Sequence, residues 1–131
     1  RPPKPEIEML VNGQIYTGMA PISKKSNVLV RIKPDADFKT HFPKDSRYVI
    51  DQVDLFVQRS LGAPVKVGSF SGSGKDATTG IPVALGNKLK ADPPGTKIYL
   101  KIGKVSRVNY QNMVVEEAFS ERELVLSAII K

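Results

Sequence analysis

The stretch RYVIDQVDLFVQR, residues 47–59, is the longest candidate β-strand in the chain. Apolar and polar residues alternate in it with a period of two, which places successive side chains on opposite faces of a strand. The apolar residues of one face are Val49, Val53, Leu55 and Val57, with Asp51 among them as the exception. The pattern predicts one long strand with one buried face.

Several other segments have the same period. A hairpin is predicted where Asn12-Gly13 separates the apolar runs 6–11 and 14–17, because both residues of such a tight turn need positive φ. In the segments 27–33 and 96–102, alternate apolar side chains are expected to point inward: Val28, Val30, Ile32, Ile98, Leu100 and Ile102. These segments predict further half-buried strands.

The rest of the chain gives weaker signals. Strands are predicted at 63–70 and 104–110, and residues 34–46 are expected to form a loop that Phe38 and Phe42 anchor. Residues 80–92 fit either two short strands or one strand and a turn. The closing segment 111–131 fits a short helix at EEAFSERELVL or a terminal strand at LVLSAII, and we favour the strand.

Many short strands separated by Gly, Pro and Asn indicate an all-β fold. We predict an immunoglobulin-like antiparallel β-sandwich, formed by a single domain over residues 6–131. Residues 1–5, Arg-Pro-Pro-Lys-Pro, are expected to be a stiff proline-rich linker to a further domain, because proline favours extended conformations.

The composition excludes several classes of chemistry. The chain of 131 residues has no cysteine, so disulfides, thiolate nucleophiles and cysteine-ligated zinc are excluded. No segment approaches the roughly 18 consecutive apolar residues of a membrane span, and no membrane contact is expected within this segment. The net charge of +7 permits attraction to anionic partners without identifying one.

The segment GSFSGSGKDATTG, residues 68–80, resembles a phosphate-binding loop only in composition. Ser69 stands where a P-loop has its first glycine, and Asp76 stands where it has the hydroxyl that binds magnesium. No helix is predicted after it to hold an anion at its N-terminus. We therefore predict a mobile loop between strands, and we expect deletion of residues 72–78 to leave the fold intact.

No residue cluster predicts an enzyme. His41, near Asp35 and Asp37, lacks the alternating ligands of a calcium loop, and no serine elbow accompanies it. The late acidic residues fit a solvated face better than a paired-carboxylate site. We predict a non-enzymatic protein without metal or cofactor.

Basic residues on the predicted outward faces suggest a partner-contact surface. The candidates are Arg31, Lys33, Lys97, Tyr99, Lys101, Lys104 and Arg107. Lysines interleaved with an aromatic residue suit single-stranded nucleic acid, yet lysine also protects exposed strands from aggregation. We favour contact with other protein domains, including self-association as a dimer. A basic β-barrel or sandwich that binds nucleic acid or another anionic ligand is the alternative.

The chain also resembles the last periplasmic domain of the M subunit of the gliding-motility and type IX secretion motor, the GldM/PorM family. The resemblance rests on the entry RPPKPE, Asp35-x-Asp37-Phe38, the stretch 47–59 with its following Gly/Ser loop, and the segments ALGNKLKA and PPGTKIYLKIGKV. The closing segment 111–131 is longer and more acidic than the family pattern. The resemblance implies a β-sandwich at the end of a periplasmic rod, a mechanical role in the cell envelope, and no catalytic residues.

Overall fold

The computed structural model describes residues 2–59, 62–89 and 91–131, so Arg1 of the predicted linker and Lys90 of the quoted ALGNKLKA segment lie outside it. Over these ranges the chain folds into short strands with one α-helix and one 3-10 helix. In chain order the elements are β1 Glu6–Val11, β2 Gln14–Ile15, β3 Val28–Lys33, α1 Ala36–His41, β4 Arg47–Ile50, β5 Gln52–Gln58, β6 Val65–Ser71, β7 Ile81–Val83, β8 Lys97–Ile102, β9 Val105–Val108, β10 Val114–Glu116, η1 Arg122–Leu124 and β11 Val125–Ile129.

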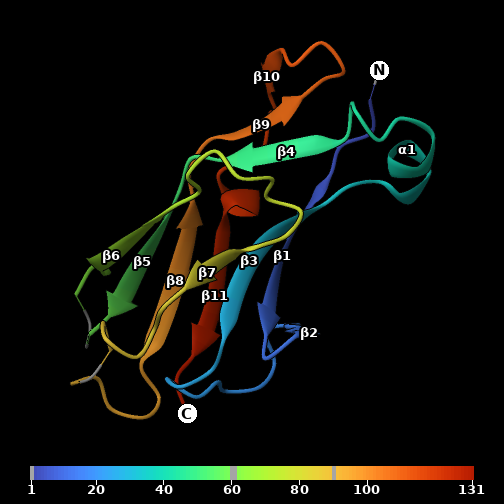
Figure 1. The fold of residues 1–131 in the computed structure, drawn as a ribbon. Helices are drawn as coiled ribbons and strands as arrows, with labels where there is room; N and C mark the ends of the chain where they lie inside the picture. Colours follow the sequence, from blue (N-terminus) through green and yellow to red (C-terminus); the bar gives the residue numbers. More distant parts are fainter. Residues whose placement is uncertain (1, 60–61, 90) are drawn as a thin grey trace.

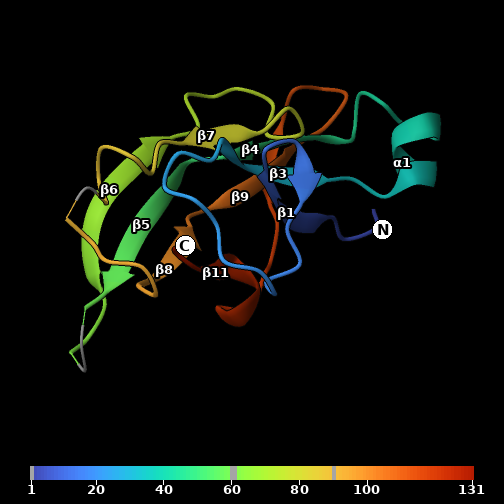
Figure 2. The same cartoon turned by 90° about the horizontal axis from the view of Figure 1, so that it is seen from below.

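The strands form three antiparallel sheets, which confirms the all-β sandwich (Figure 1). One layer has the strand order β2-β1-β3-β7, and the facing layer has the order β11-β8-β5-β6. The third sheet, β10-β9-β4, lies at the same end of the sandwich as α1 (Figures 1 and 2). The immunoglobulin-like variety of the sandwich stays a prediction.

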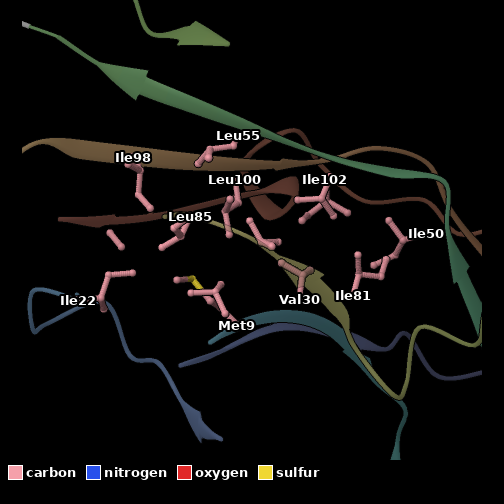
Figure 3. Packing of buried hydrophobic residues seen from close by; sticks show 14 of the residues in the cluster. Met9, Ile22, Val30, Ile50, Leu55, Ile81, Leu85, Ile98, Leu100 and Ile102 are labelled. Carbon is pink, nitrogen blue, oxygen red and sulfur yellow. The ribbon is translucent and has the colours of Figure 1, made fainter. Parts of the chain in front are cut away.

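The core fills the space between the two facing layers. Met9 and Val30 project from one layer toward Leu100 and Ile102 of the other (Figure 3). The six inward residues predicted from the alternation of 27–33 and 96–102 are all buried, with exposed fractions of 2% or less. The hairpin is also confirmed, because Asn12 and Gly13 have φ of 52° and 84° between β1 and β2.

The prediction of one long strand over 47–59 is wrong, because the stretch forms two strands in different sheets. β4 belongs to the end sheet and β5 to the sandwich, with Asp51 between them. Tyr48 and Ile50 are buried before the break, and the buried positions then change from even to odd numbers. Val49 is therefore only half-buried and does not share the buried face of Val53.

A second pair of strands bends at the same place. β9 follows β8 after Gly103 and Lys104. Ile50 pairs with Val105 and Val53 pairs with Ile102, so the number of residues between the two pairs is the same on both strands and the register continues across the bend. The two long strands thus form one ladder that turns a corner. At the corner Asp51 accepts a hydrogen bond from the Lys104 amide through Oδ1 at 2.6 Å, and its own amide donates to the Lys104 carbonyl at 3.0 Å.

Two glycines let three chain segments meet at this corner. The Gly72 amide donates to the Asp51 carbonyl at 3.1 Å, and a Cβ on Gly72 would overlap the carbonyl oxygen of Ile50. A Cβ on Gly103 would overlap the carboxylate of Asp51. Only a residue without a side chain fits at either position.

The prediction that residues 68–80 form a mobile loop is also wrong. Residues 68–71 belong to β6, and Ala77 is 1% exposed. The Ala77 amide donates to the Tyr48 carbonyl at 2.7 Å, and its carbonyl accepts from the Ile32 amide at 3.0 Å. The segment therefore connects the end sheet to the sandwich, and deletion of 72–78 would remove both bonds.

The remaining segments differ from expectation in smaller ways. The predicted loop 34–46 contains α1, which Asp35 caps by accepting from the Phe38 amide, while the Phe38 and Phe42 rings lie 5.9 Å apart. The closing segment forms β10, one 3-10 turn and β11, so the preferred terminal strand is confirmed. The described residues 80–89 and 91–92 form one strand, β7, and turns.

The start of the described chain is attached to the domain. The Lys4 ammonium lies 2.8 Å from the Glu123 carboxylate and 4.8 Å from the centre of the Phe119 ring. The hydrogen bond from Lys4, together with hydrogen bonds from Ser120, lowers the pKa of Glu123 to about 2. The division into a linker over 1–5 and a domain over 6–131 stays a proposal.

We expect Gly72→Ala to destabilise the protein by at least about 2 kcal/mol, because the new methyl group would force the Ile50 backbone away from the corner. Gly86→Ala is the matched control, since a Cβ there would meet only the Lys24 carbonyl at an ordinary 3.6 Å. Urea unfolding followed by circular dichroism measures both. Equal stability of the two variants would contradict the packed corner.

The hydroxyl of Tyr48 is fully buried and has no hydrogen-bond partner within the part of the chain that the structure describes. Burial raises its pKa to about 12, and the negative charge of Glu117 adds to this. The unfolded chain would release this proton near pH 10, whereas the folded protein keeps it up to about pH 12. Its contribution to stability is thus complete below pH 10 and is lost as the pH rises toward 12.

We expect Tyr48→Phe to be neutral or stabilising by up to about 1 kcal/mol at pH 7, because it removes an unpaired buried hydroxyl. The variant should also lose less stability than the parent between pH 10 and 12. Denaturant unfolding across this pH range measures both effects. Tyr110→Phe, at a tyrosine that is 62% exposed, is the control. A clear loss of stability in Tyr48→Phe at pH 7 would contradict the unpaired hydroxyl.

Candidate partner-contact surface

Six residues of the predicted contact surface lie on three different sheets, and the seventh, Lys104, lies between β8 and β9. Arg31 and Lys33 lie on β3 with side chains opposite to the buried ones, and Tyr99 lies in the same way on β8. Because β3 and β8 belong to facing layers, their outward faces point in opposite directions. The seven residues therefore do not form the continuous basic track that a nucleic-acid platform would need.

Three of the seven are held by contacts within the domain. Arg31 donates to the Glu8 carboxylate at 2.9 Å, and Lys104 lies 3.4 Å from Glu116. Arg107 is 11% exposed at its side chain, where it lies 3.5 Å from the Glu117 carboxylate. Among the described residues, these contacts leave Lys33 alone on one side and the β8 residues together on the other.

The residues of β8 form a surface with their neighbours across the sheet. Tyr99 lies opposite Phe56 of β5 and Ser127 of β11. Lys101 and Lys97 lie opposite Val125 and Ile129 of β11 on the same outward face. We define the β8 face as the residues Asp54, Phe56, Lys66, Lys97, Tyr99, Lys101, Val125 and Ile129.

The β8 face has an apolar centre with positive charges around it. Phe56 and Tyr99 are half-buried, while Val125 and Ile129 are 40% and 46% exposed. The Lys97 ammonium lies 5.2 Å from the centre of the Tyr99 ring. Lys97 and Lys101 form no ion pair within the described ranges of the chain. Aromatic residues next to cations are the composition of interface centres and rims.

The carboxylate of Asp54, on this face, is bound by neighbouring side chains of the same domain. Burial works against its ionisation, but hydrogen bonds from Ser69 at 2.7 Å and Gln52 at 2.8 Å, with the charge of Lys66, lower its pKa. The Lys66 ammonium lies 3.5 Å from Asp54. Asp54 therefore neutralises Lys66 and leaves the charge of Lys97 and Lys101 available to a partner.

Sequence reasoning found Lys97, Tyr99 and Lys101 but missed the other members of the face. The alternation of β5 contains a signal for Phe56, because it falls on the strand side opposite the buried Val53 and Leu55. Val125 and Ile129 become neighbours of β8 only through pairing of strands more than twenty residues apart. Nothing in the local sequence gives that register.

The residues weighed for catalysis do not form a catalytic arrangement. His41 is exposed on α1, with Nδ1 2.8 Å from the carbonyl oxygen of Asp37. A shallow cavity of about 530 Å³ lies beside it, where Phe38 and Phe42 form the apolar wall and Asp45 and Arg107 the polar one. Among the residues described, no three metal-ligating side chains gather at one place.

The glycine-rich segment has a structural role at its acidic residue. Asp76 Oδ1 accepts from the Thr78 amide at 3.1 Å and from the Tyr48 amide at 3.4 Å. A magnesium-binding residue would have its oxygens free for the ion. Instead Asp76 holds the connection between 68–80 and β4.

Comparison with models of protein families gives a match. The family model described as the GldM C-terminal domain matches residues 3–119, a range that includes every strand from β1 to β10 and ends before β11. No curated protein and no solved structure matches the chain. No helix in the described ranges has the length and apolar character needed to cross a bilayer.

Proposed function

Because the chain belongs to the GldM C-terminal domain family, a family of cell-envelope components of gliding motility and type IX secretion, we propose that it transmits force in the periplasm as a non-enzymatic contact domain. It would receive load through its N-terminal end and pass it to another protein through the β8 face. The observation that supports this most directly is the β8 face itself. It combines an exposed apolar centre with two cations that form no ion pair within the described residues.

The architecture suits a domain under load. The N-terminal end lies beside the end sheet, at the end of the molecule away from the C-terminus (Figure 1). A pull between the N-terminal end and the β8 face acts along β1, which pairs with β3 over six consecutive residues. These backbone hydrogen bonds must yield together, which makes the ladder resist shear.

The β8 face fits an acidic partner surface that has an apolar or aromatic centre. Lys97 and Lys101 would lie at the rim and speed association, while Tyr99 and Phe56 would be covered at the centre. The interaction should weaken with salt, because part of it comes from exposed charges.

We expect the combined change Lys97→Glu, Tyr99→Ala and Lys101→Glu, made in the full-length protein in its own cells, to abolish one cross-linked envelope partner. Gliding or type IX secretion should fail with it. Lys25→Glu with Lys44→Glu is the control, because it makes the same charge change at two exposed lysines that are not part of the β8 face. Quantitative mass spectrometry after cross-linking measures the partners. An unchanged set of partners in the triple variant would contradict the proposed contact.

We also propose self-association as a dimer through the hairpin of β9 and β10. This hairpin projects from the end sheet (Figure 1) and exposes four apolar residues. Tyr110, Met113, Val114 and Val115 are 62%, 58%, 68% and 41% exposed. A group of apolar residues at a protruding edge is typical of a surface that is covered in the assembled state.

We expect Val114→Lys to shift the domain from dimer to monomer in sedimentation velocity, because a charge would be buried in the interface. Val65→Lys is the control, since Val65 is also exposed, at 49%, but lies on β6. A parent protein that is monomeric at high concentration would contradict the dimer.

A further inference from the structure

Strand β11 forms one edge of the sheet β11-β8-β5-β6, and part of its backbone faces away from β8. The Ile130 amide donates to the Thr96 carbonyl at 2.8 Å, on the side of β8. Because alternate residues of an antiparallel pair bond to the same neighbour, the backbone groups of Val125, Ser127 and Ile129 point to the free edge. The bond from the Ile22 amide to the Ile129 carbonyl, on that free side, agrees with this.

Four main-chain groups at this edge have no partner among the described residues. The Val125 amide is used by the 3-10 turn, where it donates to the Arg122 carbonyl, and the Ile129 carbonyl is used by Ile22. The carbonyl of Val125, both groups of Ser127 and the amide of Ile129 remain. Their spacing is that of one further strand.

A groove runs along the same edge, between β11 and the edge of the facing layer. Two adjoining hollows of about 300 and 180 Å³ share Tyr16, Gly18 and Ser127. Ile7 and Leu126 line the first hollow and are partly buried against the core. The groove can therefore receive the inward side chains of an added strand.

The described part of the chain does not fill this edge. The segment after β2 reaches β11 only at Ile22, which forms a single parallel bridge with Ile130. The preceding residue is Pro21, which has no amide hydrogen to continue the pairing. Met19, close to the groove, is left 87% exposed and Ile15 54% exposed.

The other edge of the same sheet is protected. β6 has a bulge opposite Leu55 and Phe56, and the Lys88 side chain lies against Gly68. Bulges and lysines are common ways of blocking strand addition. In the end sheet, β10 has only three residues, and all of them are exposed. Of these edges, β11 combines open backbone groups with an apolar groove.

The charges beside β11 select the partner. Lys97 and Lys101 are the outward neighbours of Ile129 and Val125, and Lys97 also lines the groove. Glu8 lines the groove from the other side, but its carboxylate is paired with Arg31. A second copy joined through β11 would bring two rows of lysines near each other, so the charge favours an acidic strand instead.

We propose that the free edge of β11 binds an extended segment of a partner protein in which apolar and acidic residues alternate. The segment would add a fifth strand to the four-stranded sheet, with its apolar side chains in the groove and its carboxylates toward Lys97 and Lys101. This goes beyond the side-chain contact of the β8 face, because main-chain hydrogen bonds hold the partner.

The test uses a capped nonapeptide of alternating valine and glutamate as the probe, with amide exchange followed by NMR. We expect the amides of Ser127 and Ile129 to exchange at least about tenfold more slowly with the peptide bound. The same peptide with lysine in place of glutamate should bind at least about tenfold more weakly. A glutamate peptide with proline at its centre should not protect Ser127.

Ser127→Pro should abolish the protection, because it removes an amide that faces the groove and takes no part in the ladder with β8. Ser71→Pro on β6, at the other edge of the same sheet, is the matched control and should leave binding unchanged. If Ser127→Pro does not fold, Ile15→Glu with Met19→Glu tests the groove wall while β11 stays intact, and should weaken binding at least about tenfold.

No protection of Ser127 and Ile129 at millimolar peptide, or protection at β10 or β6 instead, would overturn the proposal. Equal affinity for the glutamate and lysine peptides would overturn the acidic preference. A neutral valine–threonine peptide separates this edge from the β8 face. It should still protect Ser127 in the triple variant at Lys97, Tyr99 and Lys101, even where that variant has lost its cellular partner.

Discussion

The fold depends on the corner at Asp51, where one antiparallel ladder passes from the sandwich into the end sheet. Asp51 bonds to Lys104 through both its side chain and its amide, and its carbonyl accepts from Gly72. Three segments distant in sequence therefore meet through main-chain groups, and two glycines leave room for them. The end sheet, α1 and the hairpin of β9 and β10 all take their positions from this bend.

The alternation of apolar residues predicted most strands, because each strand has one buried face that repeats every second residue. It did not predict the corner. The alternation is interrupted at Asp51, where the buried positions change from Tyr48 and Ile50 to Val53. A single exposed polar residue within one continuous strand would give the same interruption. The prediction of a mobile loop in the glycine-rich segment was wrong for a related reason. Ala77 is held by hydrogen bonds to Tyr48 and Ile32, which are distant in sequence and leave no local pattern.

The candidate site was predictable in part for the same reason. Lys97, Tyr99 and Lys101 lie on one strand, so their common face follows from their spacing. Phe56, Val125 and Ile129 join them only through the register of three strands. The family match covers β8 and β5 but ends before β11, so the strand that completes this face and carries the open edge lies outside the matched range.

The corner also has a consequence for how the domain folds. The bond between Lys104 and Asp51 spans 53 residues, and Gly72 must be in place within the loop that this contact closes. Contacts so distant in sequence slow the search for the native state, because the entropy of closing the loop is lost before the contacts form. The corner should thus assemble late and as a unit. Once it has formed, local fraying at one segment is opposed by the other two, which favours slow, all-or-none unfolding.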